Sequence, residues 1–251
     1  MTDGEVDLPV VSPPFDEEGA DEEGSSEEDD DRTRDRSRVA GVLLAAGTSD
    51  RFGDRNKLLA THDGDPLVRH AARTLLDAGL DPVVAVVGHE ADRVVDALAG
   101  LDVAVVANDA YDTGQASSLR AGIGALRDSD AQVDAAVIAL GDMPFVDPET
   151  VETLVAAYDA GVGDALAAAH DGVRGNPVLF DRRFFDALAD VAGDVGGREI
   201  LLTSGDSACV SVSDPGVRRD VDEPGDLAES EGEPDETERR PNDDSERNEN
   251  R

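Results

Sequence analysis

The sequence predicts an α/β fold, a three-layer, Rossmann-like and mostly parallel sheet with helices on both faces. Strand-length apolar runs alternate along residues 38–227 with segments whose apolar residues recur at helical spacing. This alternation is typical of parallel strands that are joined by helices. The runs are also apolar at successive positions, as in strands that are buried on both faces. About 190 residues suit one domain of this kind.

The first half of this domain alternates strands and helices without interruption. Val39–Ala45 is an unbroken apolar run followed by Gly47, and it predicts the first strand. Asp65 and Pro66 predict a helix start, because proline suits the first helical position, and Gly79 predicts the end of that helix. The same reasoning predicts, in order, a strand at Val83–Val87, a helix through Val94 and Leu98 that ends at Gly100, a strand at Val103–Ala107, a helix that begins near Gln115–Ser118 and a strand at Val133–Leu140.

The second half departs from this simple alternation. Asp147–Pro148 predicts another helix start. Two apolar runs, Ala165–Ala169 and Pro177–Phe180, flank a turn at Gly172–Gly175 and predict a hairpin or an extended excursion. The remaining predictions are helices around Arg182–Leu188 and Gly197–Leu202 and strands at Ala208–Val212 and Val217–Val221.

Both ends of the chain are acidic and poor in large apolar residues. Residues 1–38 hold 15 Asp and Glu against four Arg, and residues 228–251 hold ten against four. Such segments bury too little apolar surface to offset the conformational entropy that ordering costs. The sequence therefore predicts a disordered acidic arm at residues 1–37, one domain at residues 38–227 and a disordered acidic tail at residues 228–251.

The net charge of −36 excludes several classes of function. Binding of a nucleic-acid backbone requires clustered Lys and Arg, so we expect no nucleic-acid partner. The apolar runs are too short to span a bilayer and the N-terminus does not resemble a secretion signal, so we expect a cytoplasmic protein with no membrane partner. Residues 39–227 alone hold 33 acidic against 14 basic residues. This balance resembles that of halophilic proteins, whose charge repulsion is screened by concentrated salt.

The loop after the first predicted strand carries the strongest chemical signal. Ligands of open α/β sheets bind beyond the carboxyl ends of the strands. Residues 44–57 read LAAGTSDRFGDRNK and contain Gly47 and the cations Arg51 and Lys57. Backbone N–H groups of such a loop can cradle phosphates, which the cations neutralise. Lys57 is the only lysine of the chain, which favours a functional role for it.

Six segments, in order, resemble the MobA-like nucleotidyltransferases. They are LAAGTSDRFGDRNK at 44–57, GQASSLRAG at 114–122, LGDMP at 140–144, GNPVLF at 175–180, GDVGGR at 193–198 and DVDEPGDL at 220–227. The last three, and the Ala-Ala pair of the first, are similar to the molybdenum cofactor cytidylyltransferase branch, although Asn176 stands where histidine is usual. The resemblance implies a nucleotidyltransferase fold that uses Mg²⁺ to transfer CMP from CTP to a phosphorylated molybdopterin, releasing pyrophosphate.

The chemistry of nucleotidyl transfer suggests a role for each charged residue. A phosphate acceptor is already a nucleophile, so catalysis consists of positioning and electrostatic stabilisation. We expect Lys57 to neutralise the triphosphate and Arg51 to hold the departing pyrophosphate. Asp142 follows an apolar strand and is expected to bind Mg²⁺, with Asp222 as the second carboxylate and Asp220 as its substitute. Nucleotide contacts are expected from Leu44, Ala45, Ala46, Gly47, Lys57, Asn108, Ser117 and Ser118, with Gln115 nearby.

The acceptor side and the partners rest on the resemblance alone. It assigns Asn176 and Arg198 to acceptor binding and implies a molybdoenzyme or a cofactor chaperone as a partner. Other interpretations stay open at this point: Ser117 and Ser118 also suit a helix start as caps, and Asp142 also suits a residue that only fixes a bend. The alternative functions are GMP transfer to the same or another phosphorylated acceptor, and a non-catalytic nucleotide-binding or cofactor-chaperone module.

Overall fold

The computed structural model describes residues 8–15, 36–49, 52, 55–191 and 197–231. The strands of its main sheet are β1 Val10–Val11, β2 Val39–Ala45, β5 Val83–Val87, β6 Ala104–Ala107, β7 Ala135–Leu140, β8 Ala165–His170, β9 Val173–Asp181 and β10 Ser207–Ser211. A hairpin of β3 Thr61–His62 and β4 Asp65–Pro66 forms a second, small sheet. The helices are α1 Leu67–Asp77, α2 Ala91–Leu98, α3 Gln115–Asp128, α4 Pro148–Asp159, α5 Phe185–Ala189 and α6 Arg198–Thr203.

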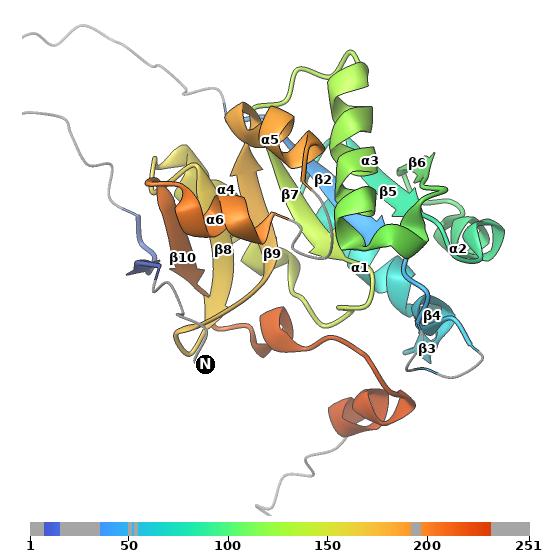
Figure 1. The fold of residues 1–251 in the computed structure, drawn as a ribbon. Helices are drawn as coiled ribbons and strands as arrows, with labels where there is room; N and C mark the ends of the chain where they lie inside the picture. Colours follow the sequence, from blue (N-terminus) through green and yellow to red (C-terminus); the bar gives the residue numbers. More distant parts are fainter. Residues whose placement is uncertain (1–7, 16–35, 50–51, 53–54, 192–196, 232–251) are drawn as a thin grey trace, which may run out of the picture.

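The strand order of the main sheet is β1-β10-β8-β9-β7-β2-β5-β6 (Figure 1). Strand β9 is antiparallel to both of its neighbours, and the other pairs of this sheet are parallel. The predicted, mostly parallel sheet is therefore confirmed, and the two runs that flank Gly172–Gly175 form the antiparallel hairpin of β8 and β9.

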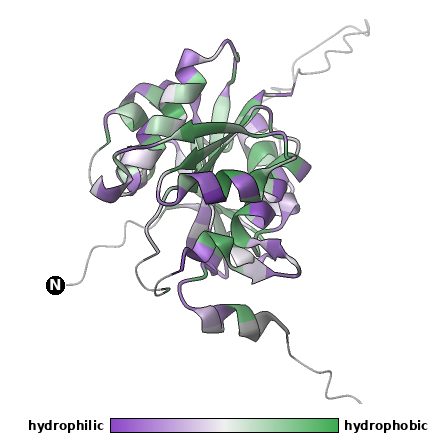
Figure 2. Cartoon of the chain, turned by 90° about the vertical axis from the view of Figure 1, so that its right-hand side faces the viewer, coloured by the Kyte–Doolittle hydropathy of each residue, from purple (hydrophilic) through white to green (hydrophobic). Residues whose placement is uncertain are grey.

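Helices cover both faces of the sheet and make the three layers. On one face, α1, α2 and α4 bury side chains such as Leu75, Val94 and Leu154 against the strands. On the other face, α3 and α5 bury Ile123 and Leu188, and α6 adds to the same core. Figure 2 shows the hydrophobic strands enclosed between helices whose outer sides are hydrophilic. The helices cover the faces of the sheet, and loops occupy the carboxyl ends of the parallel strands.

Residues Val217–Val221, predicted as a strand, do not form one. Asp214 accepts a hydrogen bond from the Gly216 N–H at 2.7 Å, and Pro215–Arg218 forms a 3₁₀ helix. Val217 and Val221 are nevertheless fully buried. The apolar run thus correctly indicated that these residues are buried, but the proline and its aspartate cap determine the backbone conformation.

Two further boundaries differ from the sequence prediction. Asp65 and Pro66 belong to the β3–β4 hairpin, and α1 begins one residue later at Leu67. Residues 8–15 fall in the arm that was predicted to be disordered, yet Val10–Val11 pairs with β10 as a parallel edge strand. For these residues the prediction is wrong, because Val11 and Phe15 pack against the core.

The rest of the two acidic ends is only partly within the structure. A 3₁₀ helix at Pro224–Glu231 enters the predicted C-terminal tail. Residues 1–7, 16–35 and 232–251 of the two predicted tails lie outside the described residues. Within the described part, no helix combines the length and apolarity that crossing a membrane requires.

Gly122 of α3 packs directly against β2 and β5 of the sheet, and it gives a test of this packing. A Cβ at this position would lie 2.4 Å from Val42 Cγ1 and 3.1 Å from Val86 Cγ2. We expect Gly122→Ala to lower the free energy of unfolding by about 1–3 kcal/mol through overpacking. Gly124 is the matched control, because a Cβ there meets nothing within 4 Å. Gly124→Ala is expected to raise the free energy of unfolding by about 0.5–1 kcal/mol. Urea unfolding measures both, and the same sign for the two variants would contradict the packing argument.

Candidate active site at the carboxyl edge of the sheet

A cavity of about 690 Å³ lies at the carboxyl ends of β2 and β7. One wall is the loop after β2, from Ala46 to Ser49. A second wall comes from residues 111–115, which lead into α3, and the third contains Lys57, Asp142 and Asp222. The loops that the sequence analysis identified after the first and fourth predicted strands therefore meet at one cavity.

Lys57 lies at the centre of the charged residues of this cavity. Its Nζ is 2.7 Å from Asp142 Oδ2 and 2.8 Å from Asp222 Oδ1. Burial alone lowers the pKa of Lys57, but the charges and hydrogen bonds of the two aspartates outweigh burial and hold the pKa above its ordinary value of 10.5. The ammonium group is consequently protonated at neutral pH, and it joins two carboxylates that come from distant parts of the chain.

The backbone at Lys57 and Leu58 is held by two residues that the sequence analysis did not select. Asn56 is buried, and its Oδ1 accepts a hydrogen bond from the Leu58 N–H at 3.1 Å. Ser49, with a φ of 61°, accepts a hydrogen bond from the Lys57 N–H through its Oγ at 3.1 Å. An asparagine just before a short helix is a typical cap, so a search for capping residues would have found Asn56.

Asp142 has one carboxylate oxygen to which no described residue donates a hydrogen bond. Oδ2 binds the ammonium group of Lys57. Oδ1 is buried and has no hydrogen-bond partner among the described residues. A buried carboxylate oxygen without a partner is costly, so its retention favours a role in binding a cation.

Asp222 reaches the cavity because hydrogen bonds hold its segment of the chain at two points. The Val221 N–H donates to the Asp142 carbonyl oxygen at 2.9 Å. Asp226 Oδ2 accepts hydrogen bonds from the backbone N–H groups of Asp222 and Glu223, each at 2.8 Å. Asp220, the substitute ligand of the sequence analysis, is exposed and is not part of the described cavity wall.

The residues expected to bind the nucleotide fall into two groups. Leu44, Ala46, Gly47 and Ser118 line the cavity, together with Gln115. Ala45, Asn108 and Ser117 are buried and do not belong to its described wall.

Asn108 instead holds the first turn of α3. Its Nδ2 donates to Ser117 Oγ at 2.8 Å and to Ser118 Oγ at 3.1 Å, and its Oδ1 accepts from the Ala110 N–H at 3.0 Å. Ser117 Oγ in turn donates to the Gly114 carbonyl oxygen at 2.8 Å. This network fixes the helix start that forms one wall of the cavity, so the geometry indicates a positioning role for Asn108 and Ser117.

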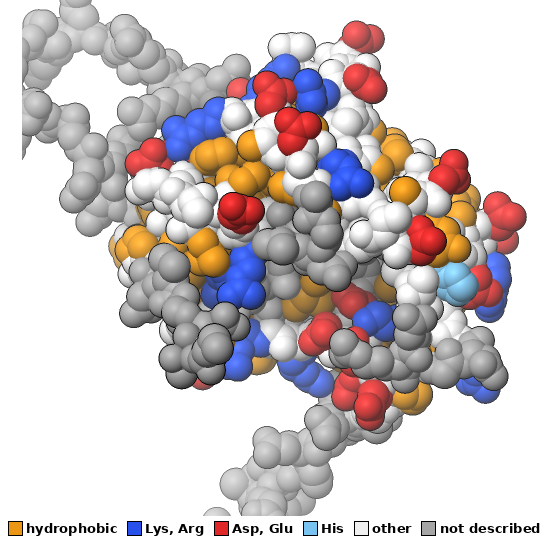
Figure 3. All heavy atoms as spheres, viewed as in Figure 1, with side chains coloured by type: hydrophobic (Ala, Val, Ile, Leu, Met, Phe, Trp, Pro, Cys, Tyr) orange, Lys and Arg blue, Asp and Glu red, His pale blue; other side chains and the backbone are white. Residues whose placement is uncertain are grey.

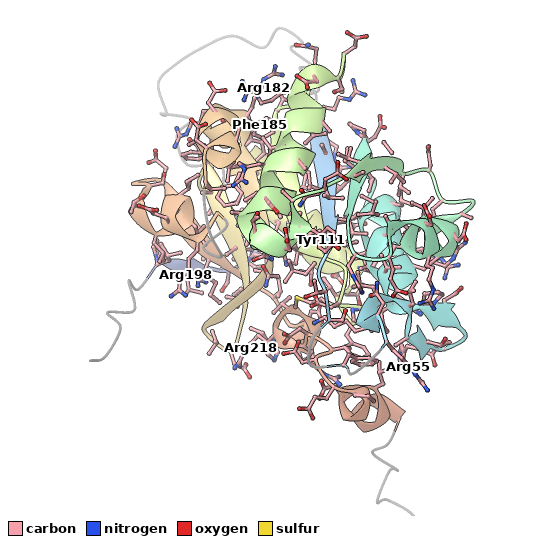
Figure 4. The ribbon with its side chains drawn as sticks, turned by 45° about the vertical axis from the view of Figure 1, so that its right-hand side comes forward. Arg55, Tyr111, Arg182, Phe185, Arg198 and Arg218 are labelled. Atoms are coloured by element: carbon pink, nitrogen blue, oxygen red, sulfur yellow. The ribbon has the colours of Figure 1, made fainter. Side chains whose placement is uncertain are left out.

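A second cavity, of about 210 Å³, adjoins the first and shares Leu44, Gln115 and Leu140 with it. Asn176 and Arg198, which the resemblance assigned to the acceptor, line this second cavity. Figure 4 shows Tyr111 and Arg198 on opposite sides of the first turn of α3, the turn that begins with Gln115.

Arg51 lies outside the described residues, as do residues 192–196 of the segment before Arg198. The expected contact of Arg51 with pyrophosphate therefore stays a prediction. The same holds for its alternative, a surface ion pair with Asp50 or Asp54, because those two residues are also outside the described part.

Comparisons with known proteins agree with this architecture. The nicotine blue oxidoreductase of Paenarthrobacter nicotinovorans is 35% identical over 170 residues, which cover 65% of this chain and 81% of that protein. A probable molybdenum cofactor guanylyltransferase of Natronomonas pharaonis is 33% identical over 120 residues, 48% of this chain and 57% of that protein. The crystal structure of Rv0371c from Mycobacterium tuberculosis H37Rv superposes with a TM-score of 0.67 and 28% identity, covering 78% of this chain and 98% of that chain.

The family comparison covers most of the domain. The MobA-like NTP transferase domain matches residues 41–208, which include Lys57, Asp142 and both cavity-forming loops of β2 and β7. Asp222 follows the matched range. With this match, the chain belongs to the family of MobA-like NTP transferase domains.

Proposed function

We propose that this chain is a Mg²⁺-dependent nucleotidyltransferase that transfers CMP from CTP to a phosphorylated molybdopterin and releases pyrophosphate. One observation carries the proposal: Lys57, Asp142 and Asp222 converge on a cavity of about 690 Å³ at the carboxyl edge of the sheet. A cation and two carboxylates are what a crowded triphosphate and its divalent ion require. A module that only binds a nucleotide has no need of this combination.

The carboxylates fit Mg²⁺ better than metals that prefer nitrogen or sulfur ligands. The described residues contain no group of three or more His, Cys, Asp and Glu that suits a metal ion. Mg²⁺ needs only one or two protein carboxylates, because water and phosphate oxygens complete its shell. Asp142, whose buried Oδ1 has no hydrogen-bond partner among the described residues, and Asp222 would hold the ion. Bound there, Mg²⁺ would neutralise phosphate charge and polarise the α-phosphate.

The contribution of the chain to the reaction is positioning and charge neutralisation. An acceptor phosphate oxygen attacks the α-phosphorus and forms a new P–O bond, while the bond to the β-phosphate bridging oxygen breaks and pyrophosphate leaves with the electron pair. The ammonium group of Lys57 donates hydrogen bonds to triphosphate oxygens as it turns away from its carboxylates. The backbone of the Ala46–Ser49 loop lines the triphosphate side. Asn176 and Arg198 hold the acceptor in the adjoining cavity.

A specific observation favours GMP transfer as the second candidate. The relative from Natronomonas pharaonis is named a probable molybdenum cofactor guanylyltransferase. The residues around the nucleotide cavity, among them Gln115, suit hydrogen bonding to either base, so the two candidates share one site and differ in the base alone.

Pyrophosphate release with each of CTP, GTP, ATP and UTP, with and without molybdopterin, tests the proposal. We expect Mg²⁺-dependent release only when the acceptor is present, and the fastest release with CTP. Faster release with GTP would replace the first candidate by the second. Tight nucleotide binding without release from any nucleotide would contradict both and support a binding module. The assay belongs in molar KCl, because concentrated salt screens the repulsion within so acidic a chain. Consumption of NADH and NADPH is measured in parallel, since one relative is named an oxidoreductase.

A further inference from the structure

The smaller cavity is lined by two arginines that have no carboxylate partner among the described residues. Arg174 comes from β9 and Arg198 from the first position of α6, and both line the cavity of about 210 Å³. Neither guanidinium group forms an ion pair or a hydrogen bond with any residue that the structure describes. Nothing in the family resemblance gave Arg174 a role.

The described wall of this cavity contains two guanidinium groups and no carboxylate. Elsewhere in the described part, Arg73 binds Asp65 and Arg93 binds Glu90. Arg183 binds two carboxylates, of which Asp206 is one. Two guanidinium groups on one cavity wall, with no carboxylate among the described lining residues, favour an anionic ligand there. Figure 3 shows Lys and Arg side chains gathered below α6 on this face.

The rest of the cavity wall is mostly apolar. Ile138, Val178, Phe180 and Leu201 contribute to it, together with Leu119 of α3. The wall therefore suits a ligand with a flat or apolar body that carries a compact anion. A guanidinium group binds such an anion with paired N–H donors, which match the oxygens of a phosphate monoester.

Close packing of the backbone fixes the position of Arg174. A Cβ at the next residue, Gly175, would lie 2.1 Å from the Val217 carbonyl oxygen. Strand β9 consequently touches the 3₁₀ helix at Pro215–Arg218 through its backbone, and Arg174 pairs in register with Ala169 of β8. The strand presents Arg174 to the cavity from a defined place.

We propose that Arg174 and Arg198 bind the phosphate group of the acceptor, and that Arg174 selects phosphorylated over unphosphorylated acceptors. The identification of this ligand as an acceptor rests on the proposed function. Leu44, Gln115 and Leu140 belong to the walls of both cavities, so a ligand of the smaller cavity lies next to a nucleotide in the larger one.

Equilibrium binding to the full-length chain tests this inference without any turnover. The probes are 6-hydroxymethylpterin phosphate and unphosphorylated 6-hydroxymethylpterin, followed by pterin fluorescence at one fixed KCl concentration. We expect Arg174→Gln and Arg198→Gln each to weaken binding of the phosphate ester about tenfold or more, since each removes charge-assisted hydrogen bonds. Binding of the unphosphorylated pterin and of CTP with Mg²⁺ is expected to stay unchanged.

Arg218→Gln is the matched control. Arg218 is exposed, its side chain has no ion-pair or hydrogen-bond partner among the described residues, and it is not part of the described wall of either cavity. Its replacement should therefore leave all three affinities unchanged. Arg174→Lys keeps the charge and loses the paired donors, and an intermediate affinity for the ester is expected. If Arg174→Gln does not fold, as judged by circular dichroism, the same affinities are measured for Arg174→Lys and Arg198→Gln instead.

Three results of the binding experiment would overturn the inference: unchanged affinity of Arg174→Gln for the ester, an equal loss for both pterins, or a similar loss for CTP. An equal loss would indicate a packing role, and a loss for CTP would assign Arg174 to the nucleotide. Different results would contradict the proposed function and this inference. If no acceptor supports pyrophosphate release but ester binding still depends on Arg174, the binding site stands without the reaction. If pyrophosphate release occurs and Arg174→Gln leaves the acceptor KM unchanged, the proposed reaction is supported and this inference is contradicted.

Discussion

Replacing Lys57 by alanine is expected to lower the kcat of pyrophosphate release by about 10²–10³-fold, the range found when one positioned charge-stabilising group is removed. Lys57 is the only lysine of the chain, and its Nζ lies within 2.8 Å of an oxygen of both Asp142 and Asp222. No other described cation lines the larger cavity. Initial rates at saturating CTP, acceptor and Mg²⁺ measure the effect.

The same variant has a second, opposite consequence. The ammonium group binds both carboxylates, so it competes with a divalent ion for their oxygens. Lys57→Ala is therefore expected to bind Mn²⁺ more tightly than the unaltered chain when no nucleotide is present, as measured by titration calorimetry. A loss of activity together with a gain in metal affinity separates removal of a cation from a general collapse of the site.

Folding controls decide how the result is interpreted. Removing one partner of a partly buried ion pair leaves uncompensated charge, so circular dichroism and urea unfolding accompany the rates. Lys57→Arg keeps a positive charge on a bulkier, planar group, and it should fold as the unaltered chain does and retain part of the activity. A fully active Lys57→Ala variant would remove Lys57 from the mechanism.

The sheet could be predicted because strands that are buried on both faces appear as continuous apolar runs. Val39–Ala45 and Val83–Val87 were predicted with the bounds that the structure shows. The apolar pattern does not encode backbone conformation, however. Val217 and Val221 are as buried as strand residues, yet Pro215 directs that segment into a 3₁₀ helix. The edge strand at Val10–Val11 is two residues long, too short to give a pattern.

The site could be predicted only in part, for a similar reason. Lys57 and Asp142 follow strands whose carboxyl ends share one edge, so their proximity follows from the topology. The contact of Lys57 with Asp222, 165 residues away, depends on the hydrogen bond between Val221 and Asp142, which no spacing reveals. Asn108 was expected to contact the nucleotide, whereas its amide holds the start of α3. Arg174 was missed because no motif of the sequence contains it, and only the fold brings it to the wall of the smaller cavity.

Asp142→Asn is expected to lower activity by about 10²–10³-fold at physiological Mg²⁺ and to raise the Mg²⁺ concentration for half-maximal activity by about tenfold or more. The reason is the buried Oδ1, which has no hydrogen-bond partner among the described residues. An amide in its place removes the negative charge that a divalent ion requires while preserving the shape of the side chain. Mg²⁺ titrations of pyrophosphate release measure both effects.

Asp220→Asn is the matched control, because Asp220 is exposed and close in sequence to Asp222 but is not part of the described cavity wall. It should leave the Mg²⁺ titration unchanged. The comparison also separates the two interpretations of Asp142. If Asp142 only fixed the bend at Gly141–Pro144, Asp142→Asn would lower the free energy of unfolding and leave the Mg²⁺ requirement as it was. A shifted Mg²⁺ requirement with an unchanged affinity for CTP is explained only by a carboxylate that binds the ion.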